Sequence, residues 1–249
     1  MRDGLFRFYP LFLEKGPPMR KEIPVKEYLS LRPADLKKPE YRHVWLLLFW
    51  AIEVPLFFLT EKLPLARHVI YCALDDRIPF CEALILPYVL WFGCCVFVTV
   101  YTLLRDVPVY RRFLWYMIGT ALVSFSFFLF YPSVFPGQPD PLPRQNFFAW
   151  MVSIVYGSDE PTNVFPSEHV IAALGMVFAT LHSKKLRRPA FSIPSITLQL
   201  LICVSVVFVK QHSILDVAGG AALSLPGYFL FFFPWKKRLP WNDPETAER

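Results

Sequence analysis

The sequence FPSEHVIAALGMVFATLH, residues 165–182, contains the pattern on which the whole chain is built. It opens with a polar turn that carries His169 and continues as an apolar run. A second stretch, KQHSILD at residues 210–216, repeats the arrangement, with His212 just before another long apolar run. Because polar residues at the end of a membrane helix can lie just outside the hydrocarbon, both histidines are expected where water and lipid headgroups reach the protein.

The composition is that of an integral membrane protein. Of the 249 residues, 55% are hydrophobic, 17% aromatic and only 18% charged, which is too little charge for an ordinary water-soluble surface. A helix needs about 20 apolar residues to cross a hydrocarbon core of about 30 Å. The sequence offers six such runs, at residues 43–60, 83–104, 113–131, 168–182, 190–209 and 212–233. We therefore predict an all-α, polytopic six-helix bundle, in which residues 146–156 form a partly buried approach to the short fourth run.

The distribution of positive charge predicts the orientation of this bundle, because Lys and Arg concentrate in cytoplasmic segments. Of the 26 Lys and Arg residues, 21 lie in the alternate segments 1–42, 105–112, 183–189 and 234–249. We expect a basic cytoplasmic or interfacial segment at 1–42, a catalytic membrane domain at 43–233 and a cytoplasmic tail at 234–249. Both histidine motifs then fall on the exterior or lumenal face.

Other classes of function find little support in the composition. The net charge of +6 follows from the cytoplasmic bias of Lys and Arg, so it does not indicate a nucleic-acid partner. None of the five cysteines has metal-ligand spacing, although Cys72 and Cys81 share an extramembrane loop where one disulfide could form. The sequence therefore predicts no metal and no cofactor, and the partner that the composition indicates is the bilayer.

His212 and Asp216 are four residues apart at the start of the last apolar run, so they lie on one face of a helix. A carboxylate in that position orients an imidazole and stabilises its positive charge, which allows the imidazole to attack phosphorus. The alternative interpretation is an interfacial polar pair that caps the helix.

His169 follows a proline and a serine that are typical of a helix start. Ser167 is expected at the N-cap, where free backbone N–H groups favour a phosphate. A second imidazole there can protonate the leaving oxygen. The alternative is a cap followed by an ordinary interfacial histidine.

A bound phosphate also requires fixed positive charge. Arg144 and Lys210 are the cations of the outer connections nearest to the two motifs. We predict that Arg144, Lys210 and Ser167 bind phosphate oxygens, while ordinary headgroup contacts are the alternative for the two cations.

The pair PSxH and HxxxD, some forty residues apart, resembles the type 2 phosphatidic acid phosphatase (PAP2) superfamily, over roughly residues 113–233. The resemblance implies a helical core in which His212 is the nucleophile, Asp216 orients it and His169 is the general acid. It also implies a metal-independent reaction through a phosphohistidine.

The chain departs from the family pattern at three places. Glu168 stands where the family most often has glycine, and it either favours the helix N-terminus or contacts a cationic or hydroxylated headgroup. Val206 replaces an arginine, for which Lys210 could substitute. The first family motif is not intact, and we take Arg144 as its degenerate equivalent.

Three functions are compatible with these residues. The first is a lipid phosphatase that hydrolyses a phosphomonoester or diphosphate on the extracytoplasmic side. The second is a phosphotransferase that moves a phospho-headgroup to an alcohol, similar to inositol phosphorylceramide and sphingomyelin synthases. The third is a catalytically silent lipid-binding or transport protein on the same fold, which the altered motifs favour.

Overall fold

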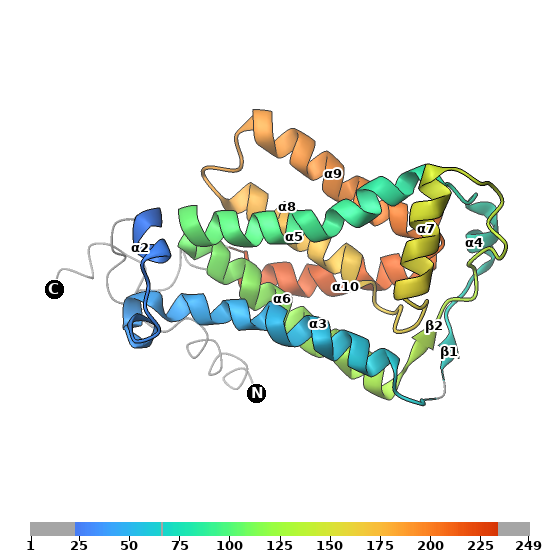
Figure 1. Cartoon of the computed structure of the whole chain (residues 1–249), viewed down its shortest axis with the longest axis horizontal. Helices are drawn as coiled ribbons and strands as arrows, with labels where there is room; N and C mark the ends of the chain where they lie inside the picture. The colour runs from blue at the N-terminus through green and yellow to red at the C-terminus, as the bar shows by residue number, and fades with distance from the viewer. Residues whose placement is uncertain (1–22, 66, 234–249) are drawn as a thin grey trace.

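The computed structural model describes residues 23–65 and 67–233 and is mostly helical. Helices run back and forth along one axis (Figure 1): α3 (Leu48–Glu61), α5 (Ile85–Arg105), α6 (Val107–Phe130), α8 (Glu168–His182), α9 (Pro189–Phe208) and α10 (Ile214–Phe231). The helices α5, α8 and α10 begin at the same end of the bundle, so the two histidine motifs lie at that end. We call it the histidine end.

The histidine end also carries the short elements of the long connections (Figure 1). The strands β1 (His68–Val69) and β2 (Ser133–Val134) pair in parallel, with His68 opposite Ser133. Around them lie α4 (Ala73–Arg77), the 3-10 helix η3 (Glu82–Leu84) and α7 (Phe147–Ser158), which lies across the bundle axis. These segments cover the helix ends: α7 is apolar and exposes Phe147 and Trp150, whereas α4 and η3 carry carboxylates, and we call α4 and η3 the polar cap.

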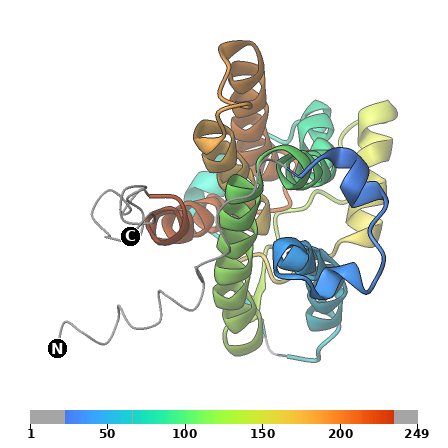
Figure 2. The same ribbon diagram turned by 90° about the vertical axis from the view of Figure 1, so that its left-hand side faces the viewer.

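The opposite end is formed by the N-terminal part of the described chain (Figure 2). Here α2 (Val25–Leu29) and the 3-10 helices η1 (Asp35–Lys37) and η2 (Pro39–Leu47) lead into α3. The Tyr28 hydroxyl lies 2.8 Å from Nε2 of His43, which joins α2 to η2, and the His43 ring lies against Tyr110 of α6 with centroids 6.1 Å apart. Most of the predicted basic segment 1–42 and the whole predicted tail 234–249 lie outside the described residues.

Five helical segments within the described residues are long and apolar enough to cross a membrane. They are Pro39–Glu61, Glu82–Arg105, Val107–Phe130, Pro189–Phe208 and Ile214–Phe231. The prediction of an all-α membrane bundle is therefore confirmed, but the count of six spans is not. The predicted fourth span, α8, has only 15 residues and is about 22 Å long, shorter than the hydrocarbon core of about 30 Å.

The short helix α8 is the centre of the bundle, where it packs against α5, α6, α9 and α10. Its small residues bring the neighbours close, as at Gly175, where an added Cβ would lie 2.5 Å from the Tyr116 ring. The Tyr116 hydroxyl in turn lies 2.9 Å from both the Ile171 carbonyl oxygen and Ser224 Oγ, which links α6, α8 and α10. Four neighbouring helices therefore enclose α8.

Candidate active site

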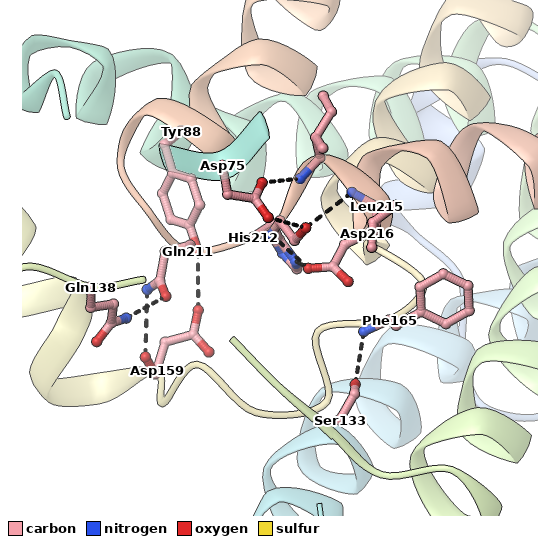
Figure 3. A network of polar contacts seen from close by, with 12 residues as sticks. Asp75, Tyr88, Ser133, Gln138, Asp159, Phe165, Gln211, His212, Leu215 and Asp216 are labelled. Carbon is pink, nitrogen blue, oxygen red and sulfur yellow. Dashed lines mark hydrogen bonds and ion pairs between the residues drawn. The ribbon is translucent and has the colours of Figure 1, made fainter. Parts of the chain in front are cut away.

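Asp216 lies in the first turn of α10, whereas His212 lies just before the N-cap Ser213 and not on the helix itself (Figure 3). Nδ1 of His212 is 3.4 Å from Oδ2 of Asp216, and Asp216 is fully buried. The same carboxylate oxygen accepts a hydrogen bond of 2.8 Å from the backbone N–H of Ser213, the N-cap residue. Asp216 is therefore fixed by the helix start and faces one nitrogen of the imidazole.

His169 lies on the first turn of α8, and its ring centroid is 5.8 Å from that of His212. The ring packs against two aromatic side chains of α5, Tyr88 and Trp91, each with its centroid at 4.5 Å. Nε2 of His169 is buried and has no hydrogen-bond partner. The two motifs, found separately in the sequence, thus converge on one position at the histidine end.

The start of α8 presents further buried polar atoms to this position. Ser167 is the N-cap residue, as predicted, but its hydroxyl makes no capping hydrogen bond and remains buried without a partner. One carboxylate oxygen of Glu168, Oε1, is buried and unpartnered as well. Since almost all buried polar groups in proteins are hydrogen-bonded, such a cluster beside two histidines is typical of a ligand site.

The two predicted cations bind protein groups in this structure. Nη1 of Arg144 lies 3.0 Å and 3.1 Å from the two carboxylate oxygens of Glu82, and the Arg144 side chain is 63% exposed. Nζ of Lys210 donates hydrogen bonds of 2.7 Å and 2.6 Å to the carbonyl oxygens of Asp75 and Ile78. Their binding of phosphate oxygens stays a prediction, and it requires these protein contacts to rearrange.

A polar network on the other side of His212 was missed by sequence reasoning (Figure 3). The Tyr88 hydroxyl donates to Oδ2 of Asp159 at 3.1 Å, and the Gln211 amide donates to the Asp159 carbonyl at 3.4 Å. Gln138 donates to Gln211 at 2.8 Å. Burial raises the pKa of the Asp159 carboxyl, against the opposing effects of His212 and of the Tyr88 hydroxyl. Asp159 therefore contacts Gln211, the neighbour of His212, and Tyr88, whose ring stacks on His169.

A glycine sets the distance between the two histidine helices. A Cβ added at Gly220 would lie 2.8 Å from the Ser167 carbonyl oxygen and 3.1 Å from Cβ of Val170. The close approach also allows the Ser167 N–H to donate to the Asp216 carbonyl at 3.2 Å. The side chain of residue 220 must therefore be absent for α8 and α10 to hold the two histidines together.

We expect Gly220→Ala to separate these helices, because backbone and a branched side chain surround the site of the new methyl group. Overpacking of this kind costs about 1–3 kcal/mol, and activity should fall about tenfold or more. Melting in detergent and initial rates would measure both effects. Gly93→Ala is the matched control, because nothing lies within 4 Å of a Cβ there. Equal activity of the two variants would show that the close approach is not needed.

The site contains no metal-ligand arrangement in the described part of the chain, where no group of three or more His, Cys, Asp or Glu side chains could hold an ion. The described cysteines are free, and they include Cys72 and Cys81.

Comparison with known proteins agrees with the geometry. A sequence model of the PAP2 superfamily matches residues 66–230, a stretch that contains both histidine motifs and all of the site described above. No curated protein and no solved structure matches the chain at a significant level. Since the matched region is well over half of the sequence and its two histidine motifs meet in space, the chain belongs to the PAP2 superfamily.

Proposed function

We propose that this membrane protein is a lipid phosphatase that hydrolyses a phosphomonoester or diphosphate through a phosphohistidine intermediate. The observation that carries the proposal is the convergence of the two imidazoles, with centroids 5.8 Å apart and buried, unpartnered polar atoms beside them. A tetrahedral phosphate fits between a nucleophile and an acid at such a separation. Membership in the PAP2 superfamily supports this class of reaction.

In the first step, His212 attacks phosphorus. Its Nδ1 faces Asp216, so Nε2 is the nitrogen that forms the bond, and Asp216 stabilises the positive charge that develops on the ring. The bond from phosphorus to the lipid oxygen breaks, and His169 donates a proton to that oxygen. The products are the lipid alcohol and a phosphorylated His212.

In the second step, water attacks the phosphorus of the phosphohistidine. His169, now neutral, accepts the proton from this water, the nitrogen–phosphorus bond breaks, and inorganic phosphate leaves. Both histidines return to their initial protonation states. The phosphate oxygens are held by the Ser167 hydroxyl and the N–H groups at the start of α8, where the helix dipole favours negative charge.

The place of the two histidines at one end of the bundle supports a membrane substrate. Both lie at the histidine end, where the candidate membrane spans begin or finish, and lipid headgroups would be within reach there. We propose the extracytoplasmic or lumenal leaflet as the source of the lipid and both termini as cytoplasmic, on the bias of Lys and Arg between alternate segments.

A second function, transfer of the phosphoryl or phospho-headgroup to an alcohol, is favoured by the carboxylates around the histidines. Glu168 offers an unpartnered oxygen at the start of α8, and Asp159 lies close enough to His212 to interact with it electrostatically. Carboxylates bind hydroxyl groups well, whereas they repel phosphate. In this alternative an acceptor alcohol, held by these oxygens, replaces water in the second step.

The purified protein in detergent, offered phosphatidate, phosphatidylglycerophosphate, a polyprenyl diphosphate and a sphingoid phosphate, provides the direct test. We expect release of inorganic phosphate from at least one of them without an added acceptor, unchanged activity in EDTA and inhibition by vanadate. Release only when an alcohol is supplied would identify the transferase. Binding of the lipids without any turnover would contradict both enzymes and support a silent lipid-binding protein.

A further inference from the structure

Asp75, a carboxylate of the polar cap, is bound to the helix start that carries His212 (Figure 3). Its Oδ2 accepts a hydrogen bond of 2.7 Å from the Ser213 hydroxyl, and its Oδ1 accepts one of 2.8 Å from the Ile214 N–H. Ser213 is 138 residues away in the chain, and Asp75 is only 3% exposed. A distant segment thus satisfies two donors at the first turn of α10.

The same segment also holds the chain on the other side of His212. Lys210 donates through Nζ to the carbonyl oxygens of Asp75 and Ile78, with its own backbone in the left-handed region at φ 56°. His212 therefore lies between two attachments to α4, one at Lys210 and one at Ser213–Ile214. A loop fixed at both sides leaves the histidine little freedom to turn.

Asp75 is itself held in place. The Cys72 N–H donates to its Oδ2 at 2.8 Å, within a capping box at the start of α4. Burial raises the pKa of the Asp75 carboxyl, but the hydrogen bonds from Ile214, Cys72 and Ser213 more than compensate and lower it below its usual range. A carboxyl whose pKa is lowered on folding stabilises the protein fully at pH values above its ordinary pKa of about 4. That stabilisation is lost as the pH falls through the lower pKa of the folded state. At neutral pH the carboxylate is charged and fully engaged.

These contacts indicate a role that differs from that of the reacting groups. Three of the hydrogen-bond acceptor sites of Asp75 are filled by protein donors, so it is not a base for substrate or water. The Ser213 N–H, on the residue that Asp75 holds, donates to Asp216. Ser213 therefore links Asp75 to the nucleophile in two ways. Its N–H binds Asp216, and it is the residue next to His212 in the chain.

We propose that Asp75 is a positioning residue for the nucleophile: by binding Ser213 and Ile214 it fixes the His212–Asp216 pair in the orientation for attack on phosphorus. This inference rests on the proposed function, because it assigns Asp75 to the same reaction. Asp75 contacts neither substrate nor the reacting nitrogen. Its loss should impair the chemical step much more than the binding of lipid.

The test compares Asp75→Asn with Asp76→Asn. An asparagine keeps the size of the side chain but presents an NH₂ group to one of the donors. Asp76 is the neighbouring carboxylate, which is exposed and accepts a hydrogen bond from Tyr71. We expect kcat of Asp75→Asn to fall about 10- to 100-fold with KM changed less than about twofold, as for a misplaced nucleophile. Asp76→Asn should match the wild type in both.

A substrate-free measurement separates this inference from the proposed function. Hydrogen exchange of the peptide that contains Ile214 and Leu215 should be about tenfold faster in Asp75→Asn, as expected when a charge-assisted hydrogen bond is lost. Exchange that rises without any fall in kcat would overturn the positioning role while leaving the phosphatase proposal intact. Failure of the wild type to turn over any lipid would instead reject the phosphatase proposal, and with it the role of Asp75 in that reaction, whereas faster exchange in the variant would still show that Asp75 holds the start of α10.

A double-mutant cycle of Asp75→Asn and Ser213→Ala tests the same link, and the Ser213→Ala variant alone tests it if Asp75→Asn folds poorly. Ser213→Ala removes the hydroxyl that Asp75 binds but leaves both carboxylates in place. If the link runs through Ser213, the two substitutions together should lower kcat by clearly less than the product of their separate effects. Fully multiplicative effects, or a Ser213→Ala enzyme with wild-type kcat, would contradict it.

Discussion

His212→Ala is expected to lower kcat by at least about 10,000-fold, because the variant lacks the group that forms the covalent intermediate. His169 cannot take over, since its ring is packed against Tyr88 and Trp91 and has no carboxylate partner like Asp216. The variant should also form no phosphoenzyme. A phosphate-labelled lipid, quenched in base during turnover, would show acid-labile label on the wild-type protein and none on His212→Ala.

The matched control is His68→Ala. His68 also lies at the histidine end, where its ring stacks on Tyr131 at 4.0 Å, but it belongs to β1 and not to the site. We expect this variant to keep its activity and its phosphoenzyme. If His212→Ala were still labelled, or turned over normally, the nucleophile would have to be another residue, and the proposed two-step reaction would need to be rebuilt around it.

Much of the fold follows from hydropathy, because long apolar runs have few alternatives to a helix in a membrane. The predicted runs at 83–104 and 190–209 lie within two residues of α5 and α9 at both ends. The hydropathy pattern predicts the start of α6 at 113, but the helix begins at Val107, where the Asp106 side chain accepts a hydrogen bond from the Val109 N–H, ahead of the basic pair Arg111 and Arg112. Where the first turns of a helix contain charged residues, a hydropathy pattern places the start of the helix too late in the sequence.

The predicted number of membrane spans, six, differs from the five candidate spans of the described residues for a related reason. A short apolar run reads as a weak span, but α8 is short because it is enclosed by other helices and does not have to reach both surfaces. Hydropathy measures how apolar a segment is and does not distinguish contact with lipid from contact with protein. The central place of the His169 helix became clear only from the packing.

The site was predictable where contacts are local. His212 and Asp216 are only four residues apart, on either side of the N-cap Ser213, so their contact is local, and the PSxH sequence predicts Ser167 as the N-cap of α8. Contacts between distant segments gave no such signal. Asp75 and Tyr88 precede the residues that they contact by more than 70 positions, and nothing in their local sequence indicates those partners.

The cations show a further limit of sequence reasoning. Arg144 and Lys210 were assigned to phosphate because of their charge and their place in the outer connections. A positive side chain can equally bind a carboxylate or backbone carbonyls, as Arg144 does with Glu82 and Lys210 with α4. Charge gives the kind of partner a residue can have, whereas the fold determines which partner is within reach.

Substitution of His169 by asparagine is expected to act mainly on the departure of the lipid alcohol. Without an acid, the alkoxide must leave unprotonated, and the rate with a lipid substrate should fall about 100- to 10,000-fold. A nitrophenyl phosphate has a leaving group that needs no proton, so its phosphorylation of His212 should fall less than about tenfold. Burst kinetics with both substrates, on protein that melts like the wild type, measure the contrast.

This contrast separates the two histidines, because they have different roles in one reaction. His212→Ala should eliminate reaction with both substrates, since the nucleophile is needed whatever group departs. His169→Asn should lose much more activity toward the lipid than toward the nitrophenyl ester. Its dephosphorylation step should also slow, because that step needs a base to accept a proton from water. Equal losses with the two substrates would mean that the His169 ring, packed against Tyr88 and Trp91, only shapes the site. The acid would then have to be sought among the carboxylates, first Glu168, whose free oxygen lies on the same turn of α8.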